Sequence, residues 1–513
     1  MRTWGRTGLA VATGLGLLLG TGACTDEPAP QPSPSPSPST VPTTYSGASP
    51  PGLADEPIRY LRGAETTGSG VLDDPLGVRV QPVGDAFLIS SSSEQRHILQ
   101  RAADGATLWE GSRRIDRFTT DRAGEDVFVV APGSGDEGGT TAAVDAAGNT
   151  VWTSALSRED YVNGWVVRRP EGWSPDAPYG AFAIHDLDGD EVWAYEFTEE
   201  HTQRAEPEES GTPTADETSA SPRPSPTVTV SGANGSPAPE DIDPERTGVP
   251  VGAGGDILLL RDGAGTIQAR NLSAEGEALW RLGDSAGETA PGGASFERPE
   301  PQIVGIFDLP EQEEPQTSPA ASAASPSPSP SPSASTSAST SPSPASAPDP
   351  RRGVLLRWSY SESESYLSMS ELASGALLWS VAEPGYNPID REFSVTPVAG
   401  TIYDAASGTL LLPQRSGETP FIAVDVASGE ILWRFESDAE RAISPAFALN
   451  GYFYGDSRGA DDSNFQVVLD ADTKDVVSDD LAGYVEAVTD DGHALVVQNR
   501  QRFVFAADPD SSG

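Results

Sequence analysis

The chain has 513 residues, of which 36% are hydrophobic, and its 46 prolines gather in Ser/Pro runs, so much of the length cannot form a core. The 77 acidic residues outnumber the 32 basic ones and give a net charge of −45, which excludes nucleic-acid binding by repulsion of phosphate. The single cysteine excludes intrachain disulfides and cysteine-based metal clusters, and the single lysine leaves almost no place for Schiff-base or P-loop chemistry.

The N-terminus is predicted to be a secretory signal peptide over residues 1–23. Arg2 and Arg6 precede an apolar stretch over residues 9–20 that is too short for a comfortable membrane span. Small residues then lead into Cys24, in an arrangement that resembles a bacterial lipobox, although Thr21 stands where Leu is more common. The resemblance implies lipidation of Cys24. The alternative is a plain secreted protein in which this cysteine is incidental.

A Pro/Ser-rich tether is expected over residues 24–55, because this composition cannot bury enough apolar surface to fold. A lipid on Cys24 together with such a spacer would hold the folded body at the extracytoplasmic face of the cell membrane. We therefore expect the membrane, through this lipid, to be one partner. The folded body is predicted over residues 56–510.

The body contains a repeated motif of a strand, a turn closed by Gly, and a second strand. In each copy, Trp lies four residues after the Gly. Each copy is typical of a β-hairpin, since Gly supplies the positive φ that a tight turn requires. The copies are Gly105–Trp109, Gly148–Trp152, Gly189–Trp193, Gly276–Trp280, Gly375–Trp379 and Gly429–Trp433.

The spacing of the repeat predicts a β-propeller. Successive glycines lie 43, 41, 87, 99 and 54 residues apart, and the two long gaps contain low-complexity insertions near residues 198–250 and 311–350. Without roughly 45 residues for each insertion, the period matches a four-stranded propeller blade. A seventh, degenerate copy has Lys474 for Gly and Ser478 for Trp, and residues 484–509 indicate about three further strands. We predict an all-β propeller of eight blades, with seven as the alternative, closed by a strand from residues 56–61 or 77–82.

These copies resemble the blade signature of quinoprotein-type propellers, the pyrroloquinoline-quinone-like repeats. The hairpin with Ala423, Asp425, Ser428, Gly429 and Trp433 has the whole signature, and the hairpin with Ala143, Asp145, Gly148 and Trp152 has a turn one residue shorter. The bias toward Arg over Lys and toward Ala, Gly and Pro indicates a high-GC bacterium. The resemblance implies that the repeated tryptophans dock neighbouring blades, namely Trp109, Trp152, Trp193, Trp280, Trp379 and Trp433. Trp165 and Trp173 lie outside the slot, and their loss is expected to matter less.

Residues for catalysis or metal binding are sparse. Asp186, Asp188 and Asp190 form a weak calcium candidate, because alternating carboxylates in one loop can face a cation, but Asp is common in turns for other reasons. The four histidines, His97, His185, His201 and His493, show no paired spacing. RDGAGT at residues 261–266 is predicted to be a hairpin turn, since strand-like segments flank it. We expect no catalytic residues, and no cofactor or metal.

Three functions remain open. The first is a non-enzymatic scaffold in the cell envelope that binds a protein or a small ligand, as many propellers of this repeat type do. The second is a dehydrogenase that uses pyrroloquinoline quinone and calcium, although the adjacent-cysteine disulfide of that group is absent. The third is a solute-binding or sensing module. A monomer is expected in each case, and whether the Ser/Thr/Pro insertions are glycosylated is left open.

Overall fold

The structure is a computed structural model. It describes residues 44–61, 77–132, 139–199, 245–262, 266–283, 300–310, 351–359, 365–387, 398, 400–415, 419–458, 464–499 and 501–508. Within these ranges helical structure is confined to short turns, among them the 3₁₀ turn Leu272–Ala274 and helix α1 (Asp438–Arg441). No helix in the described part of the chain has the length and apolar character of a membrane span.

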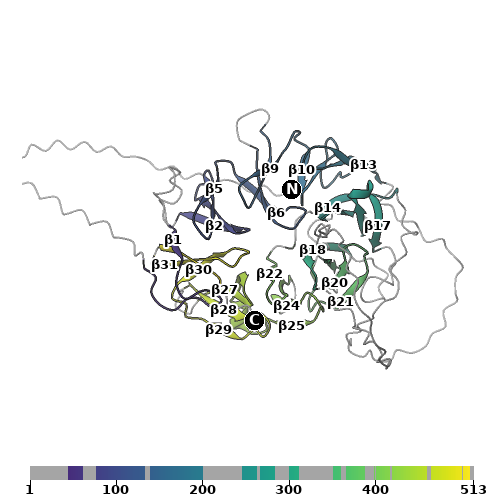
Figure 1. The fold of residues 1–513 in the computed structure, drawn as a ribbon. Helices are drawn as coiled ribbons and strands as arrows, with labels where there is room; N and C mark the ends of the chain where they lie inside the picture. Colours follow the sequence, from purple (N-terminus) through teal and green to yellow (C-terminus); the bar gives the residue numbers. More distant parts are fainter. Residues whose placement is uncertain are drawn as a thin grey trace, which may run out of the picture. The chain divides into compact units, whose positions relative to one another are not determined.

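The strands form eight antiparallel sheets of four strands each, so the chain is an eight-bladed β-propeller (Figure 1). The first four blades follow chain order. Blade 1 is β2 (Val78–Val83), β3 (Ala86–Ser91), β4 (His97–Arg101) and β5 (Thr107–Gly111); blade 2 is β6 (Ile115–Thr120), β7 (Asp126–Val130), β8 (Ala142–Asp145) and β9 (Thr150–Thr153); blade 3 is β10 (Glu159–Val162), β11 (Trp165–Arg168), β12 (Gly180–His185) and β13 (Glu191–Phe197); blade 4 is β14 (Val249–Gly254), β15 (Ile257–Arg261), β16 (Ile267–Asn271) and β17 (Glu277–Leu282).

The remaining blades continue this order until the last, which also takes a strand from the N-terminal side. Blade 5 is β18 (Glu300–Asp308), β19 (Arg352–Ser359), β20 (Ser365–Glu371) and β21 (Leu377–Ala382); blade 6 is β22 (Ile402–Asp404), β23 (Thr409–Pro413), β24 (Phe421–Asp425) and β25 (Ile431–Arg434); blade 7 is β26 (Ser444–Leu449), β27 (Tyr452–Arg458), β28 (Asn464–Asp470) and β29 (Val476–Ser478); blade 8 is β30 (Tyr484–Val488), β31 (Ala494–Gln498), β32 (Gln501–Phe505) and β1 (Arg59–Leu61).

The last blade is completed by the N-terminal strand. β1 pairs antiparallel with β32, so that Arg59 lies opposite Val504 and Leu61 opposite Arg502. In Figure 1 the purple β1 accordingly lies beside the yellow strands of the C-terminal blade. Of the two segments considered for closure, residues 56–61 therefore contain the closing strand, and residues 77–82 belong to blade 1. This pairing protects the outer edge of β32 from the solvent.

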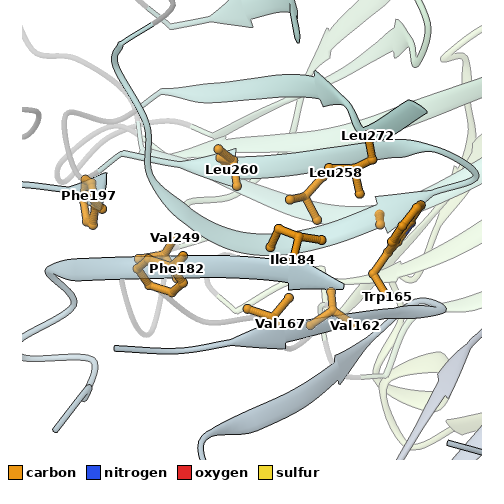
Figure 2. Close-up of a cluster of buried hydrophobic side chains, with 11 residues drawn as sticks. Val162, Trp165, Val167, Phe182, Ile184, Phe197, Val249, Leu258, Leu260 and Leu272 are labelled. Atoms are coloured by element: carbon orange, nitrogen blue, oxygen red, sulfur yellow. The ribbon is translucent and has the colours of Figure 1, made fainter. Parts of the chain in front are cut away.

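Adjacent blades share apolar clusters, which explains why the middle strands are apolar on both faces. One cluster joins β11 and β12 of blade 3 to β14 and β15 of blade 4, with Phe182 and Ile184 facing Leu258 and Leu260 (Figure 2). All four of these side chains are buried. The blade-to-blade contact is therefore where most of the core lies.

The folded unit begins earlier than the sequence analysis expects. Residues 44–55 were assigned to the tether, yet Tyr45 packs edge-on against Phe503 and Phe505 of β32 with ring centroids 5.5 and 5.0 Å apart. Leu53 is also buried. The Pro/Ser-rich composition of this segment gave no indication that Tyr45 and Leu53 pack on the propeller. The signal peptide, Cys24 and residues 25–43 lie outside the described residues, as do most of the two insertions, which fall between β13 and β14 and between β18 and β19.

Candidate functional site

The tryptophan slot has the same register in every hairpin that carries it. In the six hairpins the Trp lies beside a β-bulge whose extra residue is in the fourth strand, and it pairs with the third strand, as Trp433 does opposite Ala423 and Trp379 opposite Met369. Blade 7 keeps the bulge with Ser478 in the Trp position. A bulge increases the local twist and redirects the side chain beside it. The Trp side chain on the fourth strand is thereby directed toward the next blade.

Three slot tryptophans make the same contact with the following blade. The indole Nε1 of Trp280 donates to the carbonyl of Leu372 at 2.7 Å, and the other two bonds join Trp379 to Val426 at 2.9 Å and Trp433 to Ala471 at 2.7 Å. Each acceptor stands three residues before the turn residue of its hairpin, which is Gly375, Gly429 or Lys474. All three tryptophans are buried.

The turn glycines of blades 5 and 6 are required for two reasons. Gly375 and Gly429 have φ of +69° and +75°, a region that side chains disfavour. A Cβ on Gly429 would also lie 2.4 Å from the ring of Trp379, and one on Gly375 would lie 2.5 Å from the ring of Trp280. The turn and the neighbouring ring therefore fit together only without a side chain. Lys474 adopts φ of +66° in the same position of blade 7, and its Nζ lies 2.7 Å from Glu440.

The other three slot tryptophans contact the next blade differently. Trp109 is half-buried and meets Phe128 of blade 2 edge-on at 5.1 Å. Trp152 is buried and lies 6.0 Å from Tyr161 of blade 3. Trp193 is half-buried and covers Gly276 of blade 4. The six slot positions thus lie at blade junctions, but with different burial and different hydrogen bonding.

The contacts of Trp165 argue against the expectation that its loss matters less than that of the slot tryptophans. Trp165 is 3% exposed and belongs to the cluster of Figure 2. Its Nε1 donates to the carbonyl of Gly255 in blade 4 at 2.9 Å, and the guanidinium of Arg122 from blade 2 lies 3.5 Å above its ring. It therefore links three blades from a position outside the repeat. Trp173 is only half-buried, under the guanidinium of Arg169.

An arginine takes the place of tryptophan at the junction between blades 8 and 1. Arg59 on β1 donates through Nε to the carbonyl of Ala102 at 2.8 Å, and Ala102 stands three residues before the turn residue Gly105. Its guanidinium covers Gly105, where a Cβ would lie 3.1 Å from Nη1. Burial lowers the pKa of Arg59 to about 10, partly offset by Asp104. Arg59 was not predicted from the sequence, because the repeat defines this position by Trp and not by Arg.

A cavity of about 1150 Å³ is lined mainly by the first strands of blades 2 to 6 and the turns that follow them, together with the turn after β24 and Asp490 after β30 of blade 8. In each blade the first and third strands run parallel, so the turns after them lie at one end, here called the turn end. Phe118 on β6 and Tyr403 on β22 both line the cavity and are 41% and 37% exposed. Phe307 meets the Tyr403 ring edge-on at 5.0 Å.

Carboxylates dominate the charge of this cavity. Six line it, namely Asp121, Glu125, Asp160, Asp308, Asp425 and Asp490, against Arg117, Arg261 and Arg352. Arg117 pairs with Asp160, and Arg352 lies 3.7 Å from Asp308. Desolvation and the neighbouring carboxylates of Asp126, Glu125 and Asp491 raise the pKa of Asp490 to about 6, although the residue remains accessible. The potential at this position is therefore negative.

The same negative potential acts on the aromatic side of the cavity. Burial raises the pKa of Tyr403, and Asp404, Asp308 and Asp425 raise it further. The sequence analysis missed the cavity entirely, because its residues come from separate blades and follow no motif. No local pattern in β6 or β22 marks Phe118 or Tyr403 as lining a cavity.

The residues considered for chemistry do not come together. The Asp186 carboxylate accepts the backbone N–H of Asp190 at 2.9 Å, as in an ordinary turn, and Asp188 is exposed. No group of three or more His, Cys, Asp or Glu side chains suited to a metal ion occurs in the part of the chain that the structure describes.

The histidines that the structure describes lie in different blades. His97 is buried with Nδ1 2.7 Å from the Ser90 hydroxyl. His185 lies in blade 3, and His493 in blade 8 pairs with Asp491 at 2.9 Å. His201 lies outside the described residues. β15 and β16 pair antiparallel on either side of residues 262–266, as a hairpin requires, and residues 263–265 of the connection lie outside the described residues.

No protein-family model and no curated protein matches the chain. Solved structures of low similarity match it. BamB from Moraxella catarrhalis is 13% identical, with 85% of this chain and 97% of that one covered and a TM-score of 0.36. The quinohemoprotein alcohol dehydrogenase ADHIIG from Pseudomonas putida HK5 is 13% identical, with 83% and 73% covered and a TM-score of 0.35. A europium-containing methanol dehydrogenase is 11% identical, with 82% and 83% covered and a TM-score of 0.38. The eight-bladed architecture itself rests on the strand pairing described above.

Proposed function

We propose that the chain is a lipid-anchored, extracytoplasmic propeller of a high-GC bacterium, with repeats of the quinoprotein type, that binds a partner at the turn end of its central cavity. The observation that carries the binding role is the cavity itself, with two large aromatic side chains, Phe118 and Tyr403, left exposed on blades 2 and 6. Exposed aromatic side chains at the rim of a concave surface are typical of binding sites, where they supply apolar area at low entropic cost.

The lining favours binding over quinone-dependent dehydrogenation. Pyrroloquinoline quinone is a polycarboxylate and requires positive charge around it, whereas this cavity has twice as many carboxylates as arginines. Arg117 and Arg352 already face Asp160 and Asp308. A calcium ion beside a quinone needs converging oxygen ligands, and the described residues contain no such cluster. The residues therefore do not fit the cofactor, and we assign no step to it.

The anchoring part of the proposal rests on the sequence alone. Cys24 follows a signal-like apolar segment and precedes a Pro/Ser-rich spacer, and this order is typical of lipoproteins. A spacer of this composition separates the anchor from the folded unit, so a partner at the cavity remains accessible.

The binding role is tested by paired capture from detergent-solubilised envelope fractions of the producing cells. The cavity variant Phe118→Ala/Tyr403→Ala is compared with the control variant Leu377→Ala/Val476→Ala, whose residues are also exposed but lie on the outermost strands β21 and β29. We expect a protein that wild type and control retain and the cavity variant loses. Equal capture by all three baits would contradict binding at the cavity, and loss of a small solute instead would favour a solute-binding module.

The anchor is tested by the Cys24→Ala variant. We expect it to leave the membrane fraction while keeping the wild-type circular dichroism spectrum and melting temperature. If it stayed with membranes after a high-salt wash, the lipoprotein assignment would be wrong and a plain secreted or otherwise attached protein would remain.

A further inference from the structure

The carboxylates of the cavity form two separate groups at the turn end. One group surrounds Asp490 in the turn after β30 and includes Glu125, which stands in the turn between β6 and β7. The other group lies near Tyr403 and consists of Asp308 at the end of β18 and Asp425 at the end of β24. The groups come from blades 8 and 2 on one hand and from blades 5 and 6 on the other.

The carboxylates differ in how far the protein already neutralises them. Asp308 has Arg352 at 3.7 Å, but its side chain is 75% exposed. Within the described residues no ion pair involves Glu125, Asp425 or Asp490. Within the described residues, the Asp425 carboxylate accepts hydrogen bonds only from the backbone N–H and the hydroxyl of Ser428. Several negative charges therefore remain available to a ligand in the cavity.

Aromatic rings lie beside these charges. Phe118, Phe307 and Tyr403 line the same cavity, and the Phe307–Tyr403 pair adjoins Asp308 and Asp425. The faces of aromatic rings attract cations, and Arg and Lys side chains also pack their methylene chains against such rings. Rings and carboxylates together favour a ligand that carries both positive charge and apolar surface.

We propose that the cavity binds an extended Arg- or Lys-bearing segment of a partner protein. The two carboxylate groups are spread over four blades, which suits several cationic side chains along a peptide better than one metal ion. The volume of about 1150 Å³ exceeds the usual upper range for small-molecule pockets, which is about 1,000 Å³, and leaves room for a chain segment. The net charge of −45 further attracts a basic partner during encounter.

The inference deepens the proposed function, on which it rests, and is tested with the purified full chain. The probe is a fluorescein-labelled Arg/Gly peptide, followed by anisotropy, with a Gln/Gly peptide of equal length as the uncharged comparison. The cavity variant is Glu125→Gln/Asp490→Asn. Its matched control is Asp188→Asn/Glu191→Gln on the β12–β13 hairpin, which changes the net charge equally at exposed residues that do not line the cavity.

We expect wild type to bind the Arg/Gly peptide and not the Gln/Gly peptide. The cavity variant is expected to bind about tenfold more weakly, because two facing charges are lost. The control is expected to change affinity by less than about twofold, since distant charges act only through a salt-screened field. Tyr403→Leu keeps apolar bulk and removes the aromatic face, and it is expected to weaken binding by about threefold.

Three results would overturn the inference. The first is absence of peptide binding to wild type. The second is an equal loss in the cavity and control variants, which would show unspecific attraction to net charge. The third is displacement of the peptide by spermine at comparable concentration, which would identify a small polycation as the ligand. Envelope capture that depends on Phe118 and Tyr403 without any peptide binding would leave the proposed function intact and remove only this inference.

Discussion

Blades 4 to 6 and blades 1 to 2 place a tryptophan at the same position of the fourth strand, yet they dock the next blade in different ways. Trp280, Trp379 and Trp433 each donate to a carbonyl of the following blade, whereas no such bond is made by Trp109 or Trp152. The β-bulge that aims the side chain is present in both groups. The difference must therefore come from the blade that receives the ring.

The length of the receiving turn accounts for this difference. The turns that receive Trp280, Trp379 and Trp433 close with a bond from the turn residue to the fourth residue before it, as from Gly429 N–H to the Asp425 carbonyl. The residue directly after the acceptor, such as Val426 after Asp425, then has a carbonyl to which the indole of the preceding blade donates, as Trp379 does. The turns after Trp109 and Trp152 are one residue shorter, so that Gly148 N–H bonds to Asp145 and Gly189 N–H bonds to Asp186. The residue three positions before the turn Gly is then Asp145 or Asp186, and its carbonyl already accepts the Gly N–H.

The junction between blades 8 and 1 supports this account with a different side chain. The turn that ends in Gly105 has the longer form, since its N–H bonds to the Arg101 carbonyl. Ala102 therefore has a free carbonyl, and Arg59 donates to it. The turn form decides whether a donor is accepted, and either Trp or Arg can supply the donor.

The largest effect is expected for Trp433→Ala, one of the tryptophans of blades 4 to 6 that donate to the next blade. Removing a buried ring that stacks near Phe435 and donates to Ala471 is expected to lower the free energy of unfolding by about 3–5 kcal/mol. Trp433→Phe keeps most of the ring volume and removes only the donor, so its cost is expected to be about 1 kcal/mol. Urea unfolding followed by far-ultraviolet circular dichroism measures both. Equal losses in the two variants would mean that ring packing does not hold blades 6 and 7 together.

The next comparison reverses the ranking that the repeat alone suggests. Trp165→Ala, outside the slot, is expected to cost about 3–5 kcal/mol, because the ring is fully packed and links blade 3 to Arg122 and Gly255. Trp109→Ala, inside the slot, is expected to cost about 1–2 kcal/mol, because the ring is half-buried and makes no cross-blade indole bond. The same urea experiment compares them. A larger loss of unfolding free energy for Trp109→Ala than for Trp165→Ala would mean that the slot position, not burial, determines how much a tryptophan stabilises the propeller.

The turn glycines separate backbone strain from ring packing. Gly429→Ala is expected to cost about 2–4 kcal/mol, since the new Cβ meets the Trp379 ring in addition to the unfavourable φ. Gly189→Ala has a similar positive φ of +95° but nothing within 4 Å of the new Cβ, so only about 1 kcal/mol is expected. Melting temperatures of the two variants test this. If both fell equally, the neighbouring ring would have no part in the requirement for Gly.

The amino-acid sequence predicts the blades well and the cavity poorly, for a physical reason. The Gly–Trp hairpin is a local pattern whose turn and strand chemistry repeats, so the eight blades and the closing segment could be inferred from it. Trp165 and Arg59 act across blades through ordinary strand positions, which no local pattern distinguishes. The cavity is lined by side chains that lie hundreds of residues apart in the sequence, such as Phe118 and Tyr403. They line one cavity only because the blades close into a ring.

The smallest effect concerns Asp490 at the junction of blades 8, 1 and 2, where turn hydrogen bonds and carboxylates meet. Asp490 N–H donates to the Gly84 carbonyl, and Gly84 N–H donates to the Asp126 carboxylate.

Because the pKa of Asp490 rises from 3.8 to about 6 on folding, the native state binds this proton more tightly than the unfolded chain does. The Asp490 contribution therefore makes wild type less stable as the pH rises from about 4 to about 6. Asp490→Asn removes this contribution, so the variant should be more stable than wild type at pH 7, by less than about 1 kcal/mol because the residue is accessible and screened. The advantage should disappear below about pH 3, where Asp490 is protonated in both the folded and the unfolded state. The carboxylates facing it are Asp126, Glu125 and Asp491, the last of which is paired with His493, and all are unchanged in the variant. Melting temperatures of wild type, Asp490→Asn and the exposed control Asp188→Asn across this range measure the effect. A wild-type curve parallel to that of Asp490→Asn would show that the carboxylates at this junction do not repel one another, and the contrast between the two kinds of blade contact would then rest on tryptophan packing alone.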